Sequence, residues 1–292
     1  MNRRSFVGAA ALSAFGKPAR AAERLPIRKG VLLGMLPERL SLLERFRLAK
    51  EVGFELMECP TIRNQQEALA IRDAAAETGL RVHSVMNSDH WKYPLSSASA
   101  DDVARSMECM EVSLRNARLW GADTVLLVPA VVNPETRYEE AWERSRNQIR
   151  KLIPLAKDLQ VVIAVENVWN KFLLSPMEFA RYVDEFESPW VKAYFDVGNV
   201  VLFGYPQDWI RTLGPRILKV HLKDFRFASD PKTKQRVAEF VPLLDGEIDW
   251  PQVYAALREI GYRGAATVEV RGGEREDLAE ISRRVDRILS NS

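Results

Sequence analysis

Residues 160–167 read QVVIAVEN, a short run of β-branched and small apolar residues that ends close to a carboxylate, Glu166. Valine and isoleucine favour strands, and a run that is apolar throughout is typical of a strand buried on both faces. The pattern recurs three times further along the chain: AYFDVGN (193–199) contains Asp196, ILKVHLKD (217–224) contains His221, and AATVEV (265–270) contains Glu269. Each run therefore places one side chain that can bind a metal near the C-terminal end of a predicted strand.

The rest of the chain repeats a unit of one strand and one helix. Apolar runs alternate with stretches whose apolar residues are spaced by three and four, the period of an amphipathic helix. We predict strands over 31–36, 54–59, 80–86, 124–128, 161–166, 191–196, 217–222 and 265–270, and helices over 40–52, 65–78, 101–120, 138–159, 175–187, 206–212, 250–260 and 274–289. Residues 225–246 form a longer connection without a predicted element.

Eight strand–helix pairs without a change of composition predict an α/β fold, a single (β/α)8 TIM barrel over residues 28–290. The alternative is a doubly wound open sheet, which normally has a glycine-rich turn after its first strand. The corresponding residues here, GMLP (34–37), do not form such a turn.

The composition is typical of a globular protein, with 47% hydrophobic and 28% charged residues among 292. A net charge of +2 at pH 7 supplies no basic surface, so we expect no nucleic-acid partner. The two cysteines, Cys59 and Cys109, lack the spacing of a metal-binding finger. We interpret them as buried free thiols, with a disulfide as the open alternative.

The first 22 residues read MNRRSFVGAAALSAFGKPARAA and have the layout of a cleavable secretory signal peptide. The arginine pair before Phe6 and the weakly apolar core resemble the twin-arginine type, although Asn2 stands where Ser or Thr is usual. The apolar run is too short to span a bilayer, which needs about 20 residues. We therefore expect export, to the periplasm, and no membrane association after cleavage.

The four polar residues at the strand ends predict a metal site. In a barrel of this kind the C-terminal ends of the strands meet at one mouth, and neighbouring strands lie about 4.8 Å apart. Glu166, Asp196, His221 and Glu269 would then offer oxygen ligands and one imidazole nitrogen, a set that suits Mn²⁺, Mg²⁺, Co²⁺ or Zn²⁺. Taken singly, each glutamate could be solvated at a strand end and His221 could be a packed core histidine. Four such residues on consecutive strands favour the metal site.

At these residues the chain resembles the sugar isomerase/epimerase superfamily with the xylose-isomerase-like barrel, which includes ketose 3-epimerases, pentulose-phosphate 3-epimerases and hydroxypyruvate isomerases. The matching phrases are AVENVWN, YFDVGN, VHLKD and TVEV. The resemblance implies that Glu166, Asp196, His221 and Glu269 bind one divalent metal ion, with Mn²⁺ preferred. It also implies that Glu166 and Glu269 are the catalytic acid/base pair, since proton transfer next to a metal-polarised carbonyl needs such a pair.

Two departures from the family bear on the substrate. Ketohexose epimerases tend to have a substrate-binding histidine three residues after the aspartate, where this chain has Asn199, as in the pentulose-phosphate branch. The signal peptide points the other way, because sugar phosphates are mainly cytoplasmic. We therefore expect a free ketose or keto-sugar. The family also places an arginine shortly after the metal histidine, and Arg226 is the candidate here.

Further residues are expected around the substrate. His90 lies on the predicted loop after the third strand and is followed by aromatic residues on which a sugar could stack. Glu58, near the end of the second strand, could accept a sugar hydroxyl or be solvated, and Trp169 could shape the rim of the site. His83 is interpreted as packed within the barrel, and Lys223 and Asp224 as groups that orient the site.

Three functions follow from this set of residues. The leading hypothesis is a metal-dependent epimerase or isomerase. A lyase that acts on a 3-keto-glycoside by β-elimination would use the same metal site, and a sugar-binding protein without catalysis would not need all four ligands. A three-metal endonuclease would need more ligating histidines than the three in this chain. The oligomeric state stays open, with a homo-oligomer among the alternatives.

Overall fold

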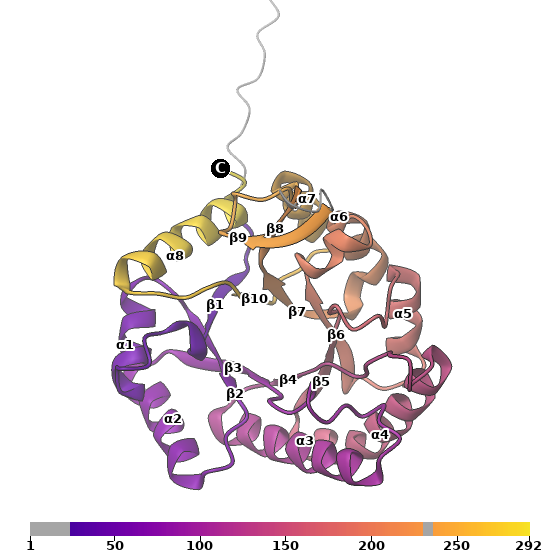
Figure 1. Ribbon diagram of the computed structural model, residues 1–292. Helices are drawn as coiled ribbons and strands as arrows, with labels where there is room; N and C mark the ends of the chain where they lie inside the picture. Colours follow the sequence, from indigo (N-terminus) through magenta and orange to yellow (C-terminus); the bar gives the residue numbers. More distant parts are fainter. Residues whose placement is uncertain (1–23, 230–235) are drawn as a thin grey trace, which may run out of the picture.

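The computed structural model describes residues 24–229 and 236–292, and their main feature is a closed barrel of eight parallel strands (Figure 1). The strands are β1 (Arg28–Leu32), β2 (Leu56–Pro60), β3 (Arg81–Met86), β4 (Thr124–Leu127), β5 (Val162–Glu166), β6 (Val191–Asp196), β7 (Ile217–Leu222) and β10 (Ala265–Val268). The predicted (β/α)8 barrel is thereby confirmed. The predicted leader, 1–22, lies outside the described residues.

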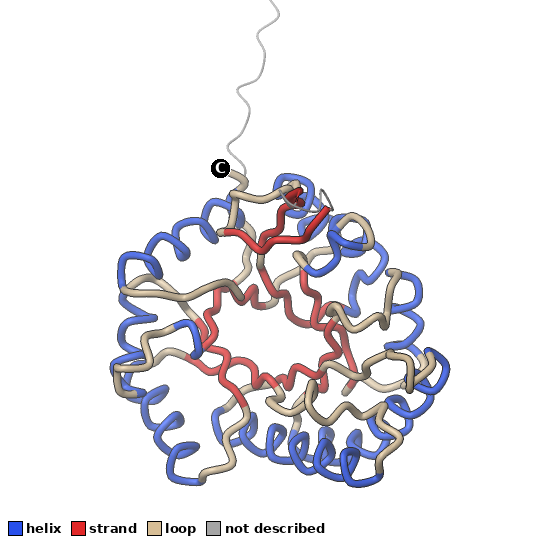
Figure 2. Tube along the Cα trace, in the orientation of Figure 1, coloured by secondary structure: helices blue, strands red, loops and turns tan. Residues whose placement is uncertain are grey.

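Neighbours in sequence are neighbours around the ring, in the order β1-β10-β7-β6-β5-β4-β3-β2. The ring closes where β1 pairs in parallel with β10, with Val31 opposite Val268. Figure 2 shows the strands as an inner ring inside an outer ring of helices. The strands are buried on both faces because one face packs inside the barrel and the other packs against helices.

Within the described ranges, eight α-helices surround the strands: α1 (Leu42–Glu51), α2 (Gln65–Thr78), α3 (Ala100–Trp120), α4 (Tyr138–Leu159), α5 (Pro176–Asp184), α6 (Pro206–Leu213), α7 (Trp250–Glu259) and α8 (Arg275–Ser290). Local sequence signals set several of their ends. Ser175 and Asp249 accept backbone N–H bonds as N-caps, each with proline in the first turn. Gly79 ends α2 with a φ of 68°, a left-handed conformation that glycine adopts readily.

The first strand differs from the prediction. It spans Arg28–Leu32, and the following residues, Leu33–Met35, form a short 3₁₀ helix (η1) where the sequence predicted the strand to continue. Lys29 explains the missed start, because this buried lysine interrupts the apolar pattern. Its ammonium lies 2.8 Å from Ser282 Oγ and also pairs with Asp286 on α8.

The long connection after β7 contains a second, smaller sheet that the sequence analysis did not predict. β8 (Asp224–Ser229) and β9 (Arg236–Val241) pair as an antiparallel hairpin apart from the barrel sheet. Asp224 holds its base, because this fully buried carboxylate accepts hydrogen bonds from Phe225 N, Leu244 N and Trp250 Nε1. These bonds attach the first residue of β8 to the start of α7. β8 itself begins two residues after the end of β7.

Both cysteines are buried free thiols, as interpreted from the sequence. The two ends of the described chain lie together, since the Leu25 N–H donates to the Leu289 carbonyl oxygen. Across the described ranges, no helix combines the length and the apolar character needed to span a bilayer.

Candidate active site

Four strand ends bring the predicted metal ligands to one place. Glu166 and Asp196 are the last residues of β5 and β6, His221 lies on β7, and Glu269 directly follows β10. The register of β6 and β7 pairs Asp196 with His221. One potential ligand atom from each of the four residues lies within 4.8 Å of those of the other three.

The histidine is at the centre of this cluster. His221 Nδ1 lies 2.9 Å from Glu166 Oε1, 3.0 Å from Glu269 Oε2 and 3.9 Å from Asp196 Oδ2. Glu166, Asp196 and His221 are buried, and the Glu269 side chain is 31% exposed. The cluster is thus enclosed on the barrel side and open at Glu269.

The donor set fits a divalent cation. Asp196 Oδ2 is fully buried and has no hydrogen-bond partner among the residues that the structure describes. A buried carboxylate oxygen without a hydrogen bond is costly unless a cation lies against it. The Lys223 ammonium supplies one positive charge beside it, because Lys223 Nζ forms ion pairs with Asp196 Oδ2 at 3.0 Å and with Glu269 Oε2 at 2.8 Å. One positive charge balances only part of the negative charge of the three carboxylates. Three carboxylates and one imidazole match the hard ligands that Mn²⁺ or Mg²⁺ binds.

The surroundings move the pKa values of the two glutamates in opposite directions. Burial raises the pKa of Glu166, helped by the charges of Glu269 and Asp196 and opposed by His221. Burial would also raise the pKa of Glu269, but His221 and Lys223 outweigh it and hold that pKa well below its usual range. Two carboxyl groups with diverging pKa values can act as an acid and a base on one substrate.

The structure places the other candidate site residues at different distances from the cluster. His90 is buried, and its Nδ1 accepts a hydrogen bond from Val128 N at 3.2 Å. Burial lowers the pKa of His90 to about 4, so the ring is neutral near pH 7 and carries its proton on Nε2. Trp91 beside it is 52% exposed.

Asn199 takes part in holding the ligands together. Its backbone N–H donates to Asp196 Oδ1 at 2.7 Å, and its side-chain amide donates to the Asn167 carbonyl at 3.0 Å. Asn167 in turn exchanges two hydrogen bonds of 2.9 Å with the backbone of Asp196. Sequence reasoning missed Asn167, although its position directly after Glu166 was a usable signal.

Arg226 is not brought to the cluster. Its guanidinium lies 2.9 Å from Glu239 Oε2 across the β8–β9 hairpin, and its side chain is 50% exposed. The cation that contacts the cluster is Lys223, only two residues after His221. We had expected Lys223 to orient the site, and its two carboxylate contacts agree with that expectation.

Trp169 and Glu58 contact different neighbours of the cluster. Trp169 donates its Nε1–H to the Asn199 carbonyl and stacks on Phe240 of β9, with ring centroids 4.8 Å apart. Glu58 is 1% exposed, so it is not a solvated strand-end glutamate. Its Oε1 lies 3.1 Å from His221 Nε2, on the side away from the carboxylates that face Nδ1. His83 is packed in the barrel as predicted, 2.8 Å from Thr267 Oγ1.

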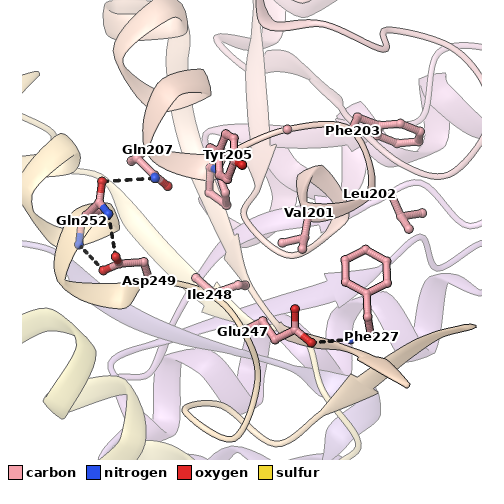
Figure 3. A pocket seen from close by; sticks show the side chains of 12 residues that line it. Val201, Leu202, Phe203, Tyr205, Gln207, Phe227, Glu247, Ile248, Asp249 and Gln252 are labelled. Carbon is pink, nitrogen blue, oxygen red and sulfur yellow. Dashed lines mark hydrogen bonds between the residues drawn. The ribbon is translucent and has the colours of Figure 1, made fainter. Parts of the chain in front are cut away.

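A separate pocket of about 580 Å³ opens near the C-terminal end of β6, between the following segment and the loop before α7 (Figure 3). Its lining includes the exposed side chains of Phe203 and Tyr205, together with Phe227 of β8. The four clustered residues do not line it.

The fold and the cluster together define a xylose isomerase-like barrel. The profile of the xylose isomerase-like TIM barrel family matches residues 46–288, and the chain belongs to this family.

Among its relatives, the chain is 27% identical over 277 residues to the L-ribulose-5-phosphate 3-epimerase UlaE of Escherichia coli O1:K1 / APEC, covering 91% of this chain and 94% of that protein. Among solved structures, a D-tagatose 3-epimerase-like protein superposes with a TM-score of 0.76 at 18% identity, covering 90% and 97% of the two chains. The 3-keto-D-glucoside 4-epimerase YcjR from E. coli superposes with a TM-score of 0.73 at 16% identity, covering 90% and 98%. These relatives are named as sugar epimerases, the isomerase class expected from the sequence.

Proposed function

We propose that this protein is a divalent-metal-dependent epimerase or isomerase of a free ketose or keto-sugar. The observation that carries the proposal is the convergence of Glu166, Asp196, His221 and Glu269 within 4.8 Å at the mouth of the barrel. The epimerase names of its relatives support the same reaction class.

In this mechanism the four residues would hold one divalent cation, most suitably Mn²⁺, which would polarise the substrate carbonyl when bound. Glu166 and Glu269 transfer the protons. One glutamate removes the proton from the carbon beside the carbonyl, and the other returns a proton to the opposite face or to the neighbouring carbon.

The neighbouring residues bind and position the sugar. His90, neutral near pH 7, offers its Nε2–H as a hydrogen-bond donor for a sugar oxygen. Trp169 and Phe240 form a stacked aromatic pair beside Lys223, whose Nζ lies 5.4 Å from the Phe240 centroid. Apolar faces of sugars pack on such rings, while Lys223 keeps positive charge beside Asp196 and Glu269.

We also propose that the protein is exported by its twin-arginine-type leader and works in the periplasm. This location favours a substrate without phosphate. The relative that acts on L-ribulose 5-phosphate, by its name, favours the opposite choice, so the phosphorylated sugar belongs in the test.

The test is a substrate screen in deuterated buffer. Purified protein loaded with Mn²⁺ is incubated with free ketoses, 3-keto-glycosides and L-ribulose 5-phosphate, and the metal is chelated before NMR spectra are recorded. We expect deuterium at the carbon beside the carbonyl of a free sugar, with an inverted centre or a shifted carbonyl. Exchange confined to the phosphorylated sugar would refute the substrate class. New C=C absorbance would identify a lyase, and binding without any exchange would identify a sugar-binding protein.

A further inference from the structure

A buried carboxylate outside the cluster, that of Glu58, contacts His221 at the imidazole nitrogen that faces away from the other carboxylates. Glu58 lies on β2, and its Oε1 is 3.1 Å from Nε2 of His221 on β7. Around the ring β2 and β7 are separated by β1 and β10, so this contact crosses the interior of the barrel. Glu58 and His221 are 1% and 0% exposed, so water does not compete for the contact.

Glu58 is itself held in place by a tyrosine. The Tyr194 hydroxyl on β6 donates to Glu58 Oε2 and lies 3.5 Å from Thr267 Oγ1 on β10. The Tyr194 ring packs on the His221 ring, with centroids 4.5 Å apart. Both oxygens of Glu58 therefore have a defined partner, and both partners are buried.

The two imidazole nitrogens of His221 face different partners. An ionised carboxylate can only accept hydrogen bonds, so the nitrogen that faces Glu58 must carry a proton. That nitrogen is Nε2. The other nitrogen, Nδ1, faces the oxygens of Glu166, Glu269 and Asp196 at 2.9, 3.0 and 3.9 Å. By the same rule Nδ1 also carries a proton while no metal is bound, and a metal ion bound among these carboxylates would replace that proton. Only a nitrogen without a proton can bind a metal.

We propose that Glu58, held by Tyr194, is a positioning residue that keeps the proton of His221 on Nε2 and presents Nδ1 as the metal ligand. This inference rests on the proposed function insofar as it takes the cluster to be a metal site. Glu58 was expected from the sequence to contact a sugar hydroxyl, and the structure gives it this different task. Carboxylates that orient a metal-binding histidine typically contribute 10- to 100-fold, roughly, to metal affinity.

The test compares Glu58→Gln with Glu55→Gln, a half-buried glutamate three residues earlier whose carboxylate pairs with Arg24 and Arg28. The glutamine side chain keeps the size of the glutamate, but its amide can donate as well as accept, so it no longer demands a proton on Nε2. We expect Glu58→Gln to raise the dissociation constant for Mn²⁺, measured by isothermal titration, by about 10- to 100-fold, and Glu55→Gln to leave it unchanged.

A spectroscopic readout separates this role from a merely structural one. The chain has three histidines, so ¹⁵N–¹H correlation spectra of the Zn²⁺-loaded protein can assign each imidazole tautomer. We expect the His221 proton on Nε2 in the wild type and a loss of that fixed tautomer in Glu58→Gln. Tyr194→Phe, which keeps the ring and removes only the hydroxyl, should give a smaller loss of affinity and serves if Glu58→Gln fails to fold.

Wild-type affinity and an unchanged Nε2–H tautomer in both variants would overturn the role of Glu58 and leave the proposed function intact. Conversely, a wild-type protein that binds metal but exchanges no sugar proton would overturn the proposed function and leave this inference standing. A wild-type protein that binds neither Mn²⁺ nor Zn²⁺ would overturn both.

Discussion

Single residues in this barrel have chemical properties set by what surrounds them. Glu166 and Glu269 have the same side chain and contact the same histidine, but burial dominates one while His221 and Lys223 dominate the other. Sequence reasoning could place both glutamates at the mouth because each ends an apolar run. It could not assign their different pKa shifts, since these depend on neighbours from other strands.

Replacing either glutamate tests the acid/base assignment. We expect Glu166→Gln and Glu269→Gln each to abolish solvent-deuterium exchange at the carbon beside the carbonyl, a loss of at least about 10²-fold, because an amide cannot take up the proton. Exchange is measured by NMR with folding checked by circular dichroism. Glu108→Gln, on the exposed face of α3, is the matched control. Wild-type exchange in either active-site variant would remove that residue from the mechanism.

His83 makes the stability of the fold depend on pH. Burial lowers the pKa of His83 to about 3, whereas an unfolded histidine titrates near its ordinary value of 6.5. Between these values the unfolded state binds more protons than the folded state, so stability falls as the pH falls. From about pH 7 to about pH 5, His83 alone should cost about 2 kcal/mol of unfolding free energy.

Urea unfolding of wild type and His83→Gln at the two pH values measures this contribution. We expect the variant to lose about 2 kcal/mol less than the wild type over the same interval, because glutamine does not titrate. Equal losses in the two proteins would show that His83 is already protonated in the fold or contributes nothing.

Among the helices and strands, the sequence pattern predicted the strand–helix units that repeat around the barrel. It missed the β8–β9 hairpin, which is not part of that repeat. Seven of the eight predicted barrel strands overlap the observed strands closely, because a strand buried on both faces is rich in apolar residues. The prediction placed the first strand three residues too late, at 31–36 instead of Arg28–Leu32, because buried Lys29 interrupts the apolar run. The β8–β9 hairpin alternates apolar and polar residues, with Phe225 buried and Arg226 exposed, and this weaker period was overlooked.

The attachment of the hairpin gives a stability prediction. In Asp224→Asn, one carboxylate oxygen becomes an NH₂ group, which cannot accept from Leu244 N and Trp250 Nε1 if it takes the place of Oδ2. We expect the free energy of unfolding in urea to fall by about 1–3 kcal/mol. Asp245→Asn is the matched control, because Asp245 is 49% exposed and, among the described residues, pairs with Arg284 at the surface. An equal effect of the two substitutions would contradict the role of Asp224.

For the whole molecule, the site depends on contacts that cross the barrel. The network of Glu58, Tyr194 and His221 joins residues 136 and 163 positions apart, and no local pattern in the sequence announces it. The convergence of the four candidate ligands could be predicted because parallel strands deliver their C-terminal ends to one mouth. The contacts of Glu58 and Tyr194 with His221 could be recognised only from the three-dimensional structure.

Metal binding should stabilise the entire fold, because the ligands come from four different strands. With Mn²⁺ held at one concentration, about one hundred times its dissociation constant at pH 8, we expect the free energy of unfolding at that pH to rise by about 2.7 kcal/mol relative to protein in chelator. The gain should shrink from about pH 8 to about pH 6, since the raised pKa values of His221, Glu166 and Asp196 make protons compete for the ligands.

Thermal unfolding followed by fluorescence, with Mn²⁺ or with chelator at each pH, measures the gain. Asp196→Asn should reduce it strongly, whereas Asp184→Asn, which alters only a surface pair with Arg216, should keep it. A gain that is the same at both pH values would show that the bound protons do not compete.

The pairing of β1 with β10 has a consequence for biosynthesis. Glu269 follows β10, the last barrel strand to leave the ribosome, and this strand must insert between β7 and the first strand made. A nascent chain that ends before this point holds three of the four ligands and an open sheet edge. Full metal affinity at the proposed site would therefore require that translation and ring closure are both finished. Under the proposed twin-arginine export, which carries folded proteins, a metal-loaded site would mark a chain that has completed folding before transport.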